Sequence, residues 1–218
     1  MGACVVDLAT GETVYEHGAD EALNPASNVK LLVAAAALRR LGAAFTAATV
    51  LLGTVDGDAI RGDIVLRGRG DPTLRSEHLW AMARQVRARG FLRVTGGIVV
   101  DDSYFDDRRL PHSFDSRPGE DSAFRSPVGA ASVDANAIEV FIGPGPAAGT
   151  PAVVASYPAG FLAVTNEAVT APGGRNALRL FARASGDRTA ARVWGSAGVE
   201  TPFAGYRRRM GASPQLGD

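Results

Sequence analysis

Ser27 and Lys30 are the two residues of this chain whose types and spacing best suit chemistry. The chain has 23 basic residues, and Lys30 is its one lysine. Lys30 follows Ser27 by three positions, and residues three apart on a helix share a face. A serine hydroxyl becomes a nucleophile when a neighbouring amine takes its proton. The pair therefore predicts a serine nucleophile with a lysine base.

A long apolar segment directly after Ser27 predicts the helix that would hold this pair. It runs from Val29 to Leu41, and Gly42 ends it. Its apolar face is broad, so we expect the helix to be buried on most sides. Burial disfavours the charged ammonium of a lysine, and the helix N-terminus favours a serine alkoxide. Serine is also a common helix cap, so Ser-x-x-Lys taken alone is a weak signal.

The remaining elements predict an α+β fold. Residues 3–8 and 13–16 alternate as two strands around a Gly-containing turn, which indicates a β-hairpin. A second, amphipathic helix is predicted at residues 77–89. Short strands are predicted on both sides of it, before residue 67, at 97–100 and from 138 to 193. Thr201 and Pro202 together predict the start of a short last helix.

Composition argues against several classes of protein. The formal net charge is zero, so we expect no nucleic-acid partner. No apolar run approaches the roughly 20 residues of a transmembrane helix, and no signal peptide is visible. Cys4 is the one cysteine, so no intramolecular disulfide is possible. Its strand-like surroundings favour a buried structural thiol.

Other candidate sites fit structural roles better. His17, His78 and His112 have neither metal-ligand spacing nor the surroundings of a catalytic triad. The Gly-Arg-Gly-Asp-Pro segment at 68–72 lacks the third glycine of a phosphate loop, so we interpret it as a turn. The acidic pairs at 101–102 and 106–107 lack calcium-loop spacing and suit capping. No metal and no cofactor are expected.

Five segments, in order, resemble the class C low-molecular-mass penicillin-binding proteins, the D-alanyl-D-alanine carboxypeptidase/endopeptidase family. Residues 24–32, Asn-Pro-Ala-Ser-Asn-Val-Lys-Leu-Leu, resemble the family's nucleophile motif. The other four lie at 5–12, 66–74, 96–105 and 126–130. The likeness covers about residues 3–210, and its specificity lies in the combination and order of the segments.

The resemblance implies a fold and a division of the chain. It implies part of a penicillin-recognising, serine transpeptidase-like lobe, made of the hairpin and the nucleophile helix, at residues 1–44. A large inserted α/β and β-rich region would follow at 45–200. Residues 201–218 would be the start of a returning helix and a frayed tail. The family's later Ser-x-Asn and Lys-Thr-Gly motifs are missing from these 218 residues.

The resemblance also implies a function. Ser27 would form an acyl-enzyme with a peptidoglycan stem peptide, with Lys30 as the base, and β-lactams would acylate the same serine. Such a protein would be periplasmic or extracellular, and the chain would hold only the nucleophile half of the site. One alternative is a non-catalytic cell-wall or protein-interaction module derived from the family. A further alternative is an esterase or β-lactamase-like hydrolase that uses the same pair.

Overall fold

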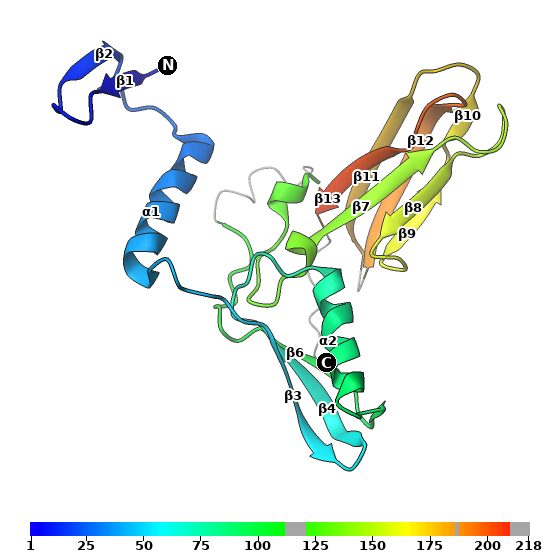
Figure 1. The fold of residues 1–218 in the computed structure, drawn as a ribbon. Coiled ribbons are helices and arrows are strands. Elements are labelled where there is room, and N and C mark those ends of the chain that lie inside the picture. Colours follow the sequence, from blue (N-terminus) through cyan, green and yellow to red (C-terminus); the bar gives the residue numbers. More distant parts are fainter. Residues whose placement is uncertain (112–120, 186–187, 210–218) are drawn as a thin grey trace. The chain divides into compact units, whose positions relative to one another are not determined.

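The computed structural model describes residues 1–111, 121–185 and 188–209 (Figure 1). The chain divides into two compact units, Met1–Thr46 and Ala47–Asp218. Helices and several small sheets occur together, so the predicted α+β fold class is confirmed.

The first unit is a hairpin followed by a helix. Strands β1 (Ala3–Val6) and β2 (Thr13–His17) pair antiparallel as a two-stranded sheet. The Asp7 carboxylate closes the turn between them by accepting hydrogen bonds from the backbone amides of Ala9 and Thr10. The 3₁₀ turn η1 (Ala26–Asn28) leads directly into α1 (Val29–Leu41).

Two expectations about this unit are wrong. Every residue of α1 is exposed, although we expected a buried helix, and Cys4 on β1 is exposed rather than buried. A two-stranded hairpin has two open faces, and burial needs a second packed layer. A hairpin and one helix supply too few elements for such a layer within their own unit.

The second unit begins with a βαβ arrangement. Strands β3 (Val50–Asp56) and β4 (Ala59–Arg67) form an antiparallel pair, and α2 (Ser76–Ala88) leads to β5 (Arg93–Val94) and β6 (Ile98–Asp101). Both later strands pair parallel with β4, because a helical crossover returns the chain in the same direction. The apolar face of α2 and this sheet line a groove of about 590 Å³.

Two further sheets follow in the second unit. In one, β7 (Ala137–Gly143) lies between β13 (Ala204–Arg209) and β8 (Val153–Tyr157). In the other, β12 (Arg188–Gly198) pairs with three strands: β9 (Leu162–Asn166), β10 (Val169–Ala171) and β11 (Ala177–Ser185). The main core lies between these sheets and includes Ile138, Val140, Ile142, Leu178 and Val193.

The predicted last helix is wrong. After Pro202 the chain forms β13, which pairs antiparallel with β7 from Ala204–Ile142 to Arg209–Ala137. Ala204 and Tyr206 pack against the core, so tertiary pairing overrides the local helix-start signal. The predicted frayed tail at 211–218 lies outside the described residues, as does His112.

Candidate active site

The Ser27 hydroxyl and the Lys30 amine are in direct contact. Lys30 Nζ donates a hydrogen bond to Ser27 Oγ over 2.9 Å. An ammonium group can only donate in this contact, whereas a neutral amine can also accept the hydroxyl proton across the same distance. The arrangement can therefore move a proton between nucleophile and base without a bridging water.

The backbone that presents Ser27 is strained and held locally. Ala26 has φ of 44°, in the left-handed region, which costs a non-glycine residue about 1–2 kcal/mol. The Asn24 side chain accepts a hydrogen bond from the Ala26 amide at 2.9 Å, and the Asn28 amide donates to the Pro25 carbonyl. These two contacts stabilise the turn that places Ser27 immediately before α1.

Both side chains of the pair are exposed. The desolvation that we expected to assist Lys30 is therefore not provided in the described structure. The pair supplies a nucleophile and a proton acceptor, and a complete acyl-transfer site also needs donors for the oxyanion. In chemical terms, the arrangement matches the nucleophile and base part of an acyl-transfer site.

The Gly-Arg-Gly-Asp-Pro segment is a turn, as the sequence predicts. The Gly68 amide donates to the Asp101 carbonyl at 3.1 Å, and the Gly70 amide donates to the Ala130 carbonyl at 2.8 Å. The Asp71 carboxylate accepts from both the amide and the hydroxyl of Thr73, and these hydrogen bonds lower the pKa of Asp71 below its ordinary value. These backbone hydrogen bonds join the segment to the loops that contain Asp101 and Ala130.

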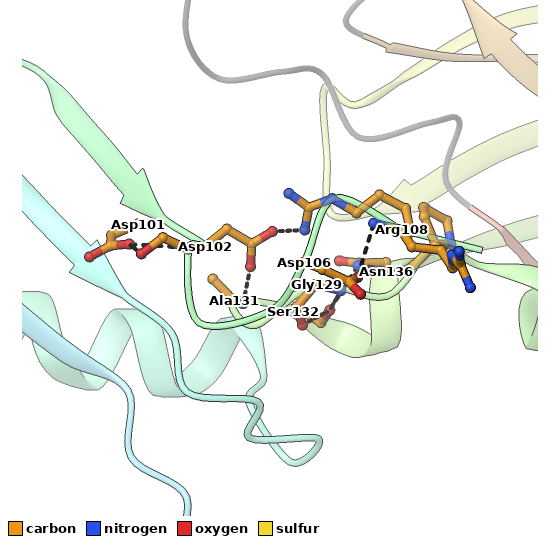
Figure 2. Close-up of polar contacts among 11 residues, drawn as sticks. Asp101, Asp102, Asp106, Arg108, Gly129, Ala131, Ser132 and Asn136 are labelled. Atoms are coloured by element: carbon orange, nitrogen blue, oxygen red, sulfur yellow. Dashed lines mark hydrogen bonds and ion pairs between the residues drawn. The ribbon is translucent and has the colours of Figure 1, made fainter. Parts of the chain in front are cut away.

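Three of the four residues of the acidic pairs, Asp101, Asp102 and Asp106, accept hydrogen bonds in loops, as Figure 2 shows. The Asp102 carboxylate accepts from the amide of Ala131 at 2.7 Å and forms an ion pair with Arg109. Asp106 accepts from the amide of Arg108 at 3.0 Å, a local turn contact that agrees with a structural role for this residue.

Asp101, which Figure 2 also labels, has a pKa below its ordinary value. Its carboxylate accepts from the Ser103 hydroxyl at 2.6 Å and pairs with Arg67 at 2.7 Å. The Ser103 hydrogen bond, followed by that from Arg67, lowers the pKa of Asp101 to about 2. The carboxylate is therefore ionised throughout the physiological range and acts as a loop anchor.

A second loop beside Asp102 is held by amide and hydroxyl groups. Ser132 Oγ accepts from the Gly129 amide, and the Asn136 side-chain amide donates to Ser132 Oγ and to the Pro127 carbonyl (Figure 2). The sequence reasoning missed this network and the neighbouring Asp102–Ala131 contact, which spans 29 positions, because no local pattern marks the partners.

The described histidines take no part in a catalytic constellation. His17 is exposed on β2. His78 Nδ1 accepts from the Arg75 amide at 2.9 Å, so its role is to cap α2. Among the residues that the structure describes, no three His, Cys, Asp or Glu side chains gather closely enough to hold a metal ion.

Comparison with known proteins defines the family of this chain. The sequence profile of the D-Ala-D-Ala carboxypeptidase 3 (S13) family matches residues 1–207. The D-alanyl-D-alanine carboxypeptidase of Actinomadura sp. (strain R39) is 38% identical over 200 residues, which cover 87% of this chain and 37% of that relative. The chain belongs to the D-Ala-D-Ala carboxypeptidase 3 (S13) family, as the resemblance predicted.

One further relative and one solved structure are also similar to this chain. The D-alanyl-D-alanine carboxypeptidase DacB of Haemophilus influenzae is 26% identical over 140 residues, covering 62% of this chain and 29% of that protein. The crystal structure of penicillin binding protein 4 (dacB) from the same organism matches 99% of this chain and 47% of its own chain, with a TM-score of 0.70 and 21% identity. The chain therefore spans less than half the length of these relatives.

Proposed function

We propose that this chain carries the nucleophile half of a serine-type D-Ala-D-Ala carboxypeptidase/endopeptidase that acts on peptidoglycan stem peptides. The single observation that carries the proposal is the 2.9 Å contact between Ser27 Oγ and Lys30 Nζ. Membership of the family supports it, since the matching profile includes both residues.

The reaction follows from the contact. Neutral Lys30 takes the hydroxyl proton as Ser27 Oγ attacks the carbonyl carbon of the penultimate D-Ala. The new O–C bond forms, the C–N bond breaks, and Lys30 returns its proton to the departing amino group of the terminal D-Ala. Water then hydrolyses the ester on Ser27. A β-lactam would acylate the same oxygen, and the Haemophilus influenzae penicillin binding protein 4 has also been crystallised in complex with a β-lactam.

The site needs groups beyond Ser27 and Lys30. The 218 residues contain no Lys-Thr-Gly segment, since Lys30 is the one lysine. In the family, the Lys-Thr-Gly strand would supply one of the oxyanion donors, and the loss of one such donor typically slows acyl transfer by roughly 100- to 1,000-fold. Slow acylation of Ser27 is therefore expected from this polypeptide by itself, with a large gain if a complementary polypeptide supplies those donors.

The family also suggests where the reaction occurs. We place the protein in the periplasm or outside the cell, where peptidoglycan is reached. Searching the described part of the chain, we find no helix that is both long and apolar enough to cross a membrane.

Covalent labelling by a fluorescent penicillin tests the proposal. Purified full chain is incubated with the probe for hours, and the adduct is measured by intact mass. Ser27→Ala should abolish the adduct, because it removes the attacking oxygen. Lys30→Arg should reduce it at least as strongly as Lys30→Ala, because arginine keeps the positive charge but does not become a neutral base.

The exposed positions of Ser27 and Lys30 make these variants suitable, since neither side chain is part of a core. Circular dichroism confirms that each variant folds as the parent does. Absence of any adduct on the folded parent chain, or labelling that persists in Ser27→Ala, would overturn the proposal for this polypeptide.

A further inference from the structure

The outer face of strands β11 and β12 carries an organised set of arginine and aromatic side chains. Along β11, Leu178 and Ala182 are buried against the core, whereas Arg179, Phe181 and Arg183 alternate with them and are exposed. Along β12, Val193 is buried, while Arg192 and Trp194 face outward. We refer to these five exposed residues as the arginine–aromatic face.

The strand register brings these side chains together in pairs. Arg179 lies opposite Trp194, and Phe181 lies opposite Arg192. Directly opposed side chains on one face of an antiparallel pair lie within contact distance of each other. The guanidinium of Arg192 lies 5.6 Å from the centroid of the Trp194 ring. Each aromatic ring therefore has a cation beside it on a hydrogen-bonded strand pair.

The rings remain available to a partner. Phe181 is 42% exposed and Trp194 is 37% exposed. Large aromatic side chains left open beside one another on a sheet mark interaction surfaces more often than isolated exposed residues do.

The charges on the face are partly unneutralised. Arg192 forms a two-pronged ion pair with Glu167, which raises the pKa of Arg192 and lowers that of Glu167. Within residues 1–111, 121–185 and 188–209, no carboxylate pairs with Arg179 or Arg183. Apart from a 3.4 Å hydrogen bond that Arg179 donates to the Leu178 carbonyl, these two guanidinium groups can bind an anionic group.

We infer that the arginine–aromatic face is a second binding surface, separate from Ser27, for a glycan that carries carboxylates. The C–H faces of pyranose rings are apolar and stack on aromatic side chains, while guanidinium groups bind carboxylates in a planar fork. Peptidoglycan combines both features, sugar rings and peptide carboxylates. This inference rests on the proposed function and adds an anchoring site for the polymer to it.

Two other occupants fit less well. In a two-fold contact between copies of this chain, each face would meet its own kind, so that the unpaired Arg179 and Arg183 of both copies would repel. A nucleic acid would suit the arginines, but nucleic-acid-binding domains are usually strongly basic. This chain has no formal net charge and an isoelectric point near 6.8. The positive charge that would attract an anionic partner is therefore confined to the arginine–aromatic face.

Binding of the full chain to purified, insoluble peptidoglycan tests the inference by co-sedimentation. Two separate changes probe the face: the double variant Arg179→Gln/Arg183→Gln and the single variant Trp194→Thr, which keeps a strand-favouring residue. We expect each to weaken binding by about tenfold, which corresponds to the loss of one stacking or charge-assisted contact.

Matched controls lie on α2. The double variant Arg84→Gln/Arg87→Gln makes the same charge change at exposed arginines, and Trp80→Ala removes a tryptophan that is 72% exposed. Both should bind peptidoglycan as the parent does. Peptidoglycan with amidated carboxylates and a neutral chitin oligosaccharide should bind less well than the untreated polymer.

Several results would overturn the inference. These are equal weakening by the α2 controls, no sedimentation of the parent chain, or tighter binding to single-stranded DNA than to peptidoglycan fragments. Loss of self-association in the face variants, measured by ultracentrifugation, would instead identify a second copy as the occupant and would equally refute the glycan.

Penicillin labelling of the same samples keeps this inference distinct from the proposed function. Face variants that lose sedimentation but keep the Ser27 adduct support both. A parent chain that is labelled but does not sediment refutes the second surface alone. A parent chain that sediments through the face but forms no adduct refutes the enzyme and leaves the glycan surface standing.

Discussion

The substitution Gly68→Ala tests whether the turn at residues 68–72 begins with glycine because there is no room for a Cβ atom at position 68. A Cβ at position 68 would overlap the carbonyl group of Ala130 and come within 2.5 Å of the amide nitrogen of Ala131. All of these atoms belong to the backbone, so no flexible side chain can swing aside. The φ of Gly68 is outside the left-handed region, which makes the penalty purely one of space.

The expected loss of stability in Gly68→Ala has two contributions. Forcing an extra carbon into a packed site costs about 1–3 kcal/mol. Displacing the Ala130 carbonyl also weakens the hydrogen bond that it accepts from the Gly70 amide, worth about 1 kcal/mol. Together we expect a loss of about 2–4 kcal/mol in the free energy of unfolding of the second unit. For a unit of this size that lowers the melting temperature by about 5–15 °C.

Gly97→Ala provides the matched control, measured with the parent by scanning calorimetry and urea unfolding. It adds the same methyl group at a glycine that also lacks a left-handed φ, and the nearest atom is Asp63 Oδ1 at 3.7 Å, an ordinary contact. Its stability should stay within about 1 kcal/mol of the parent. Equal melting of Gly68→Ala and the parent, or an equal loss in both variants, would refute the reasoning.

Two further predictions concern the loop anchors. Asp102→Asn removes the carboxylate that binds the Ala131 amide and Arg109, so it should lower the free energy of unfolding of the second unit by about 2–3 kcal/mol, measured by urea unfolding. The control Asp106→Asn, at an exposed turn, should cost less than about 1 kcal/mol. Equal losses in the two variants would contradict the role of Asp102 as a loop anchor. The pKa of Asp101 is about 2 in the folded protein and 3.8 ordinarily, so its stabilisation is complete above pH 3.8 and is lost as the pH falls through about 2. Because the Ser103 hydroxyl is the main cause, the difference in urea midpoint between parent and Ser103→Ala should be largest at neutral pH and shrink towards pH 2; a constant difference would contradict the cause.

Local sequence patterns predicted the parts of this protein that depend on near neighbours. The apolar run from Val29 to Leu41, ended by Gly42, forms a helix with those bounds. The three-residue spacing of Ser27 and Lys30 places their side chains in contact because helical geometry alone determines it. The catalytic role of the pair stays a prediction until acylation is measured.

Tertiary structure decided what depends on residues far apart in the chain. Thr201 and Pro202 carry a helix-start signal, yet the free edge of β7 pairs with the following residues as a strand. Asp102 meets Ala131 across 29 positions, and no pattern at either residue indicates the other. Such contacts arise from loop closure and strand pairing, which local preference does not encode.

The arginine–aromatic face shows the same division. The alternation of Arg179, Phe181 and Arg183 is visible in the sequence and marks one side of a strand. Only the register of β11 with β12 places Trp194 opposite Arg179 and Arg192 opposite Phe181. The sequence by itself thus determined the contact between Ser27 and Lys30, helices α1 and α2, and the family likeness, because these rest on neighbours within a few residues. The loop anchors and the composite surface were decided by the fold, because they are built from strands and loops that meet only after the chain has closed on itself.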